Sequence, residues 1–275
     1  MSRSLSVLPA LVAAGCALAP VDLTHKQCPC DEPGWSCDRS GGEPGVCVRG
    51  PSSEGDAGAC NPDESACGAL ATPLVCDGFE GETISSQWNA SAFGEGSHRR
   101  TTDAARGCGG LEIHASGEPY RYFLSQSLPG APRHEGELHV RTWLRLDPEM
   151  PIRDSVAALY VSESTAPHDG VGFHVLSGPA LTLFVERASD EVYRPIDLTY
   201  GRWTCVELHF EIAASGTVSL DVDGIERARF EGIDLLTAGG YEIVGIGTLQ
   251  HGAGEMQSRI RFDDLVIDDA PIGCI

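Results

Sequence analysis

From about residue 74 onward, apolar and polar residues alternate in short runs that are separated by Gly, Pro, Asp and Ser. A period of two is typical of β-strands with one buried face, and turns require the separating residues. No stretch shows the longer period of an amphipathic helix. The alternation therefore predicts an all-β fold, a two-sheet antiparallel jelly-roll sandwich. The expected strands are residues 111–115, 120–128, 137–146, 156–163, 171–177, 180–187, 203–212, 217–224, 225–230, 241–250 and 259–268.

The beginning of the chain has the pattern of an export signal. Arg3 precedes an apolar run, residues 5–14, that is too short to cross a membrane and that ends in AAGC, residues 13–16. Small residues before a cysteine resemble the lipobox of bacterial lipoproteins, which implies cleavage before Cys16 and a lipid on its sulfur. We expect a signal peptide at 1–15, a lipidated tether at 16–27, and a lipoprotein of the bacterial outer membrane that faces the periplasm or the cell surface. The alternative is a plain secreted protein, with Cys16 in the discarded peptide.

Cysteines dominate the next segment. Residues 28–49 hold four cysteines among Gly and Pro, with almost no apolar residues for a core, so we expect a small disulfide-rich module. Four cysteines allow three pairings, and the sequence does not choose among them. Zinc is the alternative, but the spacing of Cys28 and Cys30 is tighter than zinc sites use. Without Cys16 the chain's eleven cysteines become ten, an even number that suits an oxidising compartment. Residues 50–73 have the composition of a linker.

The charge of the chain limits its partners. With 19 Lys and Arg against 40 Asp and Glu, the formal net charge is −21. Such a protein repels nucleic acids and anionic lipids, so we expect no nucleic-acid partner. Strongly anionic polysaccharides meet the same repulsion unless a local basic patch overcomes it.

Three stretches resemble the concanavalin A-like lectin and glucanase jelly roll, in its laminin-G-like branch. They are CDGFEG (76–81) with Trp88 after it, RWTCVELHF (202–210) followed by GTVSLDVDGIE (216–226), and FDDLVIDD (262–269). The resemblance places such a domain at residues 74–275. Asp223-Gly224 also indicates a tight hairpin turn on physical grounds.

The resemblance implies that the first and last strands lie side by side. A disulfide from Cys274 to Cys76 or Cys67 would then join the ends of the domain, and Cys108 with Cys205 is the second expected pair. The same neighbourhood would bring Glu80 close to Asp263 and Asp264, where related carbohydrate-binding jelly rolls hold a structural calcium ion. The alternative is that these acids are solvated charges that protect a sheet edge.

Alternation also sorts side chains by face. In residues 137–146 and 203–212, one set of residues is apolar and faces the core. The opposite set includes His139, Arg141, Trp143, Glu207 and His209, and Tyr122 lies on a further strand. If these residues share the concave sheet, they form a groove that suits a sugar, because an aromatic ring stacks on it and forked polar groups bind its hydroxyls. The alternative is ordinary solvent-facing residues.

Catalytic chemistry has weaker support in the sequence. The Glu-x-Asp-x-x-Glu pattern of the glucanases of this fold is missing, and no catalytic residue is predicted. His139, Arg141, His209 and Tyr122 could serve a polysaccharide lyase, but the motifs of those lyases are missing. We therefore expect an exported, non-catalytic protein whose jelly roll binds a polysaccharide, a cell-surface glycan or another surface ligand. A lyase or hydrolase of the same fold, and a structural envelope protein without a small ligand, are the alternatives.

Overall fold

The computed structural model describes residues 36–38, 46–48, 65, 67, 72–148, 155–163, 170–176, 178, 180–185, 195–250 and 256–274. The chain divides into two compact units, Met1–Ala59 and Cys60–Ile275. In the first unit, β1 (Ser36–Asp38) and β2 (Val46–Val48) form an antiparallel pair. The predicted signal peptide, Cys16 and the tether lie outside the described residues. No helix in the described part of the chain is long and apolar enough to cross a membrane.

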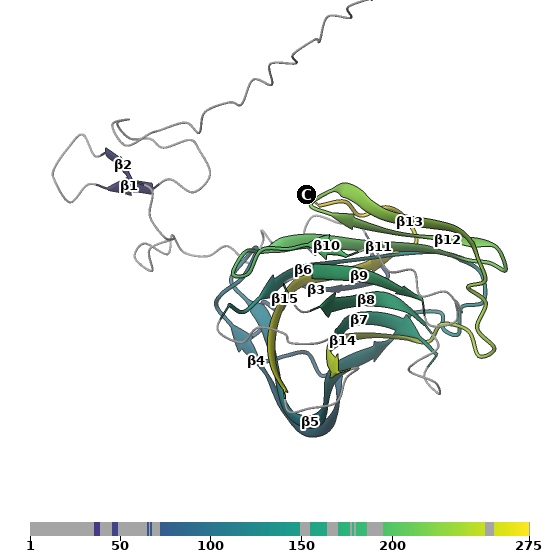
Figure 1. Cartoon of the computed structure of the whole chain (residues 1–275), viewed down its shortest axis with the longest axis horizontal. Coiled ribbons are helices and arrows are strands. Elements are labelled where there is room, and N and C mark those ends of the chain that lie inside the picture. Colours follow the sequence, from purple (N-terminus) through teal and green to yellow (C-terminus); the bar gives the residue numbers. More distant parts are fainter. Residues whose placement is uncertain are drawn as a thin grey trace, which may run out of the picture. The chain divides into compact units, whose positions relative to one another are not determined.

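The second unit is built from antiparallel strands that follow one hydrogen-bonded path (Figure 1). Its order is β10-β9-β8-β7-β14-β5-β15-β6-β11-β12-β13, with β3 paired to β15 and β4 paired to β5. The bounds of the strands are β3 Val75–Asp77, β4 Asn89–Thr101, β5 Gly110–Ser127, β6 Gly136–Leu146, β7 Val156–Ser162, β8 Gly170–Leu176, β9 Ala180–Val185, β10 Ile196–Asp197, β11 Thr204–Ile212, β12 Gly216–Val222, β13 Ile225–Ile233, β14 Ile243–Gln250 and β15 Met256–Asp268.

The long strand β5 turns this single path into two layers. Its first half, residues 111–117, pairs with β15, and its second half, residues 121–127, pairs with β14. Gly117 lies between the halves with a φ of 109°, a conformation that favours glycine. Figure 1 shows β5 curving through this bend with β4 alongside it. The first layer thus contains β10, β9, β8, β7 and β14, and the second layer contains β15, β6, β11, β12 and β13.

The core lies between these layers. Apolar side chains from β6 and β11, such as Val140 and Leu208, and from β8 and β9, such as Phe173 and Leu181, belong to one buried cluster and are fully shielded from solvent. The alternation read from the sequence produces this arrangement, because every second residue of each strand faces the other layer. The prediction of an all-β, two-sheet antiparallel jelly roll is confirmed.

The predicted disulfide pairs are wrong. Cys76 is bonded to Cys67, and Cys274 is bonded to Cys205, with Cα atoms 5.5 Å and 5.9 Å apart. Cys108 also forms a disulfide, but not with Cys205. The first and last strands are neighbours as expected, since β3 pairs with β15. After β15, however, the C-terminal segment lies against β11, and this places Cys274 beside Cys205 rather than beside Cys76.

Part of the predicted linker belongs to the jelly roll. Ser65 is buried, and its hydroxyl donates a hydrogen bond of 2.7 Å to Asp264 on β15. Cys67 is joined to Cys76 in the middle of β3. The folded unit therefore begins before residue 74, where the alternation of apolar and polar residues starts.

Candidate functional site

The predicted groove residues of β6 and β11 share one face of the second layer. His139 lies opposite His209, Arg141 opposite Glu207, and Trp143 opposite Cys205. Residues opposite each other in an antiparallel pair project to the same side. The intervening residues, including Val140 and Leu208, point into the core. The structure thus places His139, Arg141, Trp143, Glu207 and His209 together on the outer side of the sandwich, and we call this set the β6–β11 face.

Most of the β6–β11 face is covered, so the expectation of an open groove there is wrong. The exposed fractions of Arg141, His139 and Glu207 are 0%, 5% and 7%. The C-terminal segment lies against this face, because the amides of Ile272 and Gly273 donate hydrogen bonds of 3.0 Å and 2.8 Å to the carboxylate of Glu207. A sugar cannot reach the fully buried Arg141 while the C-terminal segment stays in place.

The electrostatics of the face reflect this burial. Burial lowers the pKa of Arg141, against the opposing effect of the nearby Asp264 and Glu207. No guanidinium nitrogen of Arg141 has a hydrogen-bond partner in the described part of the chain. Burial by itself would raise the pKa of Glu207, but hydrogen bonds from His139, Ile272 and Gly273 outweigh it and hold that pKa below its ordinary value. Arg141 is thus a buried cation among buried carboxylates.

Tyr122 does not join this face. It lies on the second half of β5, where it is buried in the main core. Its hydroxyl oxygen is 2.5 Å from Nδ1 of His98 on β4. Burial raises the pKa of Tyr122 and lowers the pKa of His98, so both side chains are neutral near pH 7. The set that could have served a lyase is therefore not assembled, because Tyr122 stands apart from His139, Arg141 and His209.

The three predicted calcium ligands lie in one region, near the end of β3 and in β15. Asp263 Oδ2 accepts hydrogen bonds from the amides of Ala105 and Arg106, at 2.7 Å and 2.9 Å. Both carboxylate oxygens of Glu80 lie within 3.0 Å of the amide nitrogen of Cys108. Asp264 accepts the hydroxyl hydrogen bond of Ser65. Backbone and hydroxyl donors thus occupy positions around these oxygens, and a calcium ion at Glu80, Asp263 and Asp264 stays a prediction.

Two of these acids, Asp263 and Glu80, have raised pKa values. Burial raises the pKa of Asp263 to about 8, although three backbone N–H groups donate to its carboxylate. Burial also raises the pKa of Glu80, and the charge of Asp264 contributes in the same direction. Near neutral pH the site therefore keeps a proton, unless a cation replaces it.

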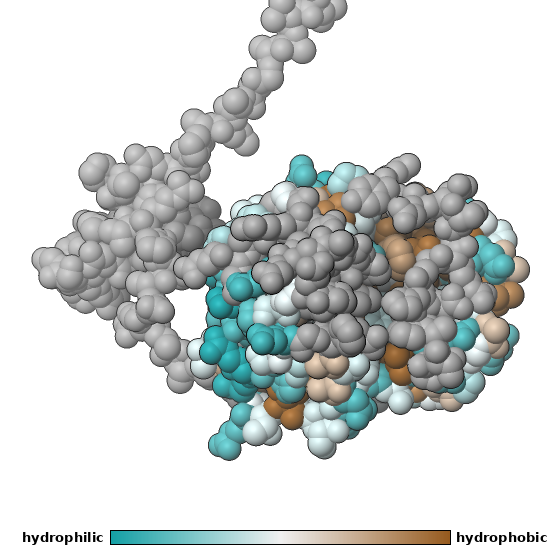
Figure 2. Space-filling view, turned by 60° about the horizontal axis from the view of Figure 1, so that its bottom comes forward, coloured by the Kyte–Doolittle hydropathy of each residue, from teal (hydrophilic) through white to brown (hydrophobic). Residues whose placement is uncertain are grey.

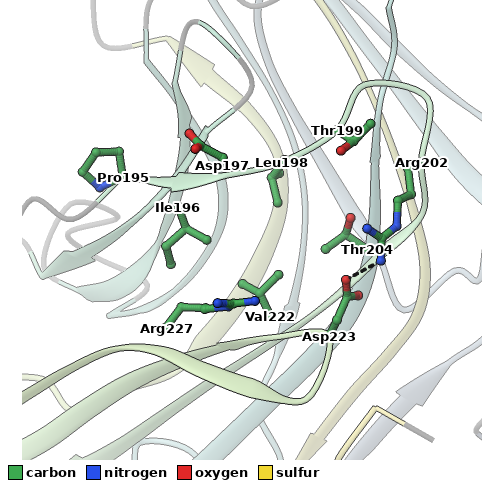
Figure 3. A pocket seen from close by; sticks show the side chains of 10 residues that line it. All are labelled: Pro195, Ile196, Asp197, Leu198, Thr199, Arg202, Thr204, Val222, Asp223 and Arg227. Carbon is green, nitrogen blue, oxygen red and sulfur yellow. Dashed lines mark hydrogen bonds and ion pairs between the residues drawn. The ribbon is translucent and has the colours of Figure 1, made fainter. Parts of the chain in front are cut away.

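A pocket of about 400 Å³ lies elsewhere, where the two ends of the strand path meet. β10 and the connection to β11 form one wall, and the β12–β13 turn forms the other (Figure 3). We call it the edge pocket. Its lining residues are Pro195, Ile196, Asp197, Leu198, Thr199, Arg202, Thr204, Val222, Asp223 and Arg227.

The Asp223-Gly224 turn shapes the edge pocket. Both residues have positive φ angles, 51° and 74°, as the two-residue hairpin turn predicted from the sequence requires. Asp223 Oδ2 lies 2.6 Å from the guanidinium of Arg202, and Oδ1 accepts a hydrogen bond of 3.1 Å from the amide of Cys205. Figure 3 shows Arg202 pointing to Asp223, with Arg227 and Ile196 at the other side of the pocket. The sequence predicted the turn but not the pocket. The opposite wall comes from residues 195–202, which show no regular alternation of apolar and polar residues.

The outer face of β4, β5 and β15 carries a second, smaller hollow. It has a volume of about 220 Å³ and is lined by Ser97, Arg99, Glu112, His114 and Arg259. Glu112 pairs with Arg99 and Arg261 at 2.7 Å and 2.8 Å. In Figure 2 hydrophilic residues gather on the side of the domain where Figure 1 shows β4. Since ion pairs hold Glu112, Arg99 and Arg261, this hollow offers a ligand fewer unengaged groups than the edge pocket.

Comparison with known proteins gives a fold and no family. No family model and no curated protein matches the chain. Among solved structures, the cellulose induced protein Cip1 has 18% sequence identity and a TM-score of 0.55, over 73% of this chain and 100% of its own. An endo-β-1,4-glucuronan lyase from the fungus Trichoderma reesei has 12% identity and a TM-score of 0.52, over 72% and 95% of the two chains. The globular domain of T. cruzi calreticulin has 17% identity and a TM-score of 0.51, over 73% and 89%. The likeness is one of fold. It agrees with a concanavalin A-like sandwich.

Proposed function

We propose that this protein is an exported, non-catalytic carbohydrate-binding protein whose jelly roll binds a neutral glycan in the edge pocket. The observation that carries this proposal is the composition of the pocket wall. Two arginines and two aspartates stand around an aliphatic surface formed by Ile196, Leu198 and Val222. Sugars present C–H faces together with hydroxyls that both donate and accept hydrogen bonds, so this combination suits them.

The pocket's charges favour a neutral sugar over an acidic one. Arg202 is paired with Asp223, while Asp197 and Arg227 have no ion pair in the described part of the chain, so two positive and two negative side chains around the pocket balance each other. The whole chain carries a formal charge of −21, which repels a polyanion. These charges support neutral polysaccharides as ligands and disfavour uronic-acid polymers.

The rigidity of the pocket supports binding. Asp223 is held by Arg202 and by the amide of Cys205, and Cys205 is fixed by its disulfide to Cys274. Polar groups that are already in position lose little conformational freedom when a ligand binds. The same contacts occupy both oxygens of Asp223, which supports a role as a hydrogen-bond acceptor rather than as a catalytic acid.

The test is binding to a panel of neutral β-glucan, xylan and mannan oligosaccharides, with glucuronan and alginate as acidic comparators. The protein should retain one or more neutral members, and Arg227→Ala should raise their Kd about tenfold or more, a loss of about 1.4 kcal/mol. Arg229→Ala is the matched control: it removes the same charge from the same strand, but Arg229 is paired with Glu226 and Glu231 outside the pocket. Equal binding by both variants, or unsaturated ends released from the acidic polymers, would contradict the proposal.

Attachment to the outer membrane through Cys16 is part of the same proposal and rests on the AAGC stretch of the sequence. Mass spectrometry of the mature protein should find Cys16 as the first residue, with a lipid on it, and Cys16→Ser should release the protein from membranes. A mature chain that begins beyond Cys16 would instead support plain secretion.

A further inference from the structure

Two histidines meet at the far end of β6 and β11 from the edge pocket. His139 and His209 are directly opposite each other in the strand pair. Their rings stack with centroids 4.3 Å apart and planes 16° from parallel. The pairing of β6 with β11 thus brings two imidazoles to one point of the outer face.

A carboxylate completes the group. Oε2 of Glu137, two residues before His139 on the same face of β6, lies 3.9 Å from His139 Nε2 and 3.5 Å from His209 Nε2. The three ligand atoms lie within 4.8 Å of one another. Among the described residues, this is the one group of three or more histidine, cysteine or acidic side chains whose ligand atoms come this close. In a tetrahedral zinc site, ligand atoms about 2.0–2.1 Å from the metal are about 3.3 Å apart. The side chain of Glu137 is 55% exposed, which gives it freedom to close the remaining gap.

Neither Nε2 atom makes a well-formed hydrogen bond within the described ranges, since Glu137 Oε2 is 3.5 Å or more away, although His139 is only 5% exposed. A buried polar atom without a partner costs free energy, and few remain in folded proteins without a reason. An ion that accepts the lone pairs of both nitrogens would supply that reason.

A second layer of contacts orients His139. Its Nδ1 lies 3.2 Å from Oε1 of Glu207, whose carboxylate accepts hydrogen bonds from the amides of Ile272 and Gly273. A carboxylate at Nδ1 favours the tautomer with the proton on that nitrogen, and this leaves the Nε2 lone pair for a metal. Metal-binding histidines are usually held in this way. The Cys205–Cys274 disulfide in turn fixes the C-terminal segment that positions Glu207.

We propose that Glu137, His139 and His209 form a binding site for a divalent transition-metal ion of the zinc class. Imidazole nitrogens select such ions over calcium, which takes oxygen ligands. Three protein ligands leave a further coordination position for water or for a group of a partner molecule. The site is separate from the edge pocket and from the predicted calcium ligands, so it stands whether or not either of those binds.

The test uses the full-length mature protein after treatment with a chelator. Calorimetric titration with zinc should give one ion per chain, and cobalt should produce absorption in the visible region from nitrogen-coordinated metal. Glu137→Gln and His209→Ala should each raise the Kd for zinc at least tenfold and remove the cobalt signal. Glu135→Gln and His114→Ala make the same chemical changes outside the group and should bind zinc as the parent does.

Glu207→Gln provides a test of the orienting contact. It leaves all three ligands in place but removes the carboxylate that orients His139. Loss of such an orienting hydrogen bond typically weakens metal binding about 10- to 100-fold, and we expect the same for zinc here. The proposal is overturned if the parent binds no zinc, or if the double variant of His139→Ala and His209→Ala keeps the full stoichiometry. The second result would place the metal elsewhere, for example on the N-terminal cysteines. Circular dichroism of each variant separates a lost ligand from a lost fold.

Discussion

The β6–β11 face and the edge pocket both include residues of β11, and both place an arginine near carboxylates, yet their surroundings differ. On the β6–β11 face, Arg141 is fully buried, with Asp264 and Glu207 nearby. At the edge pocket, Arg202 and Asp223 pair with side-chain exposures of 60% and 34%. The same residue types therefore serve the folded state in one place and remain available to a ligand in the other. Coverage by other segments makes the difference.

The largest expected effect comes from removing the two arginines in turn. Arg141→Met should destabilise the fold by about 3–5 kcal/mol, because it removes the positive charge that lies near the buried Asp264 and Glu207. Arg202→Met should cost less than about 1 kcal/mol, since exposed ion pairs contribute little. Urea unfolding of both variants measures the contrast. Similar losses in the two variants would mean that the two regions do not differ as described.

The disulfide that holds the C-terminal segment should matter nearly as much. Cys205 and Cys274 are 69 positions apart in sequence, against 9 for Cys67 and Cys76. In the chain-entropy model the longer loop contributes about 4 kcal/mol, and about 2 kcal/mol more than the shorter one. Replacing each pair by serine and comparing the urea midpoints tests this order. Faster amide exchange at Ile272 and Gly273 in the first variant alone would show that the cover over Glu207 has loosened, whereas unchanged exchange would contradict its role.

A gradual effect on stability is expected from pH. The folded-state pKa of Asp263, about 8, lies above its ordinary value of 3.8, so between these values the folded protein keeps a proton that the unfolded chain has lost. Stability should therefore fall as pH rises through this window, by at most about 1.4 kcal/mol per pH unit. Measurements in EDTA keep any calcium away from the site. Asp263→Asn should flatten the slope between pH 5 and 8, and the exposed Asp269→Asn should not. An unchanged slope in Asp263→Asn would assign the pH dependence to other groups.

The strands that the sequence predicted well are those with one continuous apolar face. β6, β11 and β12 alternate apolar and polar residues over most of their length, and the structure keeps that assignment of faces. β4 was missed, because ASAFGEGSHRRT has few apolar residues and pairs with β5 along its edge. β5 was predicted as two strands, since Gly117 interrupts the pattern where the strand bends.

The candidate sites were less accessible to prediction, for a physical reason. Alternation tells on which face His139 and Arg141 lie, but it does not tell what covers that face, because the covering residues come from an irregular segment after β15. The same irregular path explains why the partner of Cys274 was mistaken. Glu137 was overlooked because its approach to His209 depends on the register between β6 and β11, which one sequence does not supply.

The most direct test of the central claim is a titration of the isotope-labelled protein with the neutral oligosaccharide that binds best, followed by NMR. Amide signals of residues 195–204 and 222–227 should shift with a common Kd, while those of residues 137–143 and 207–209 stay in place. That result would locate the ligand in the edge pocket. Shifts confined to the β6–β11 face, or no shifts with any neutral oligosaccharide, would contradict the account.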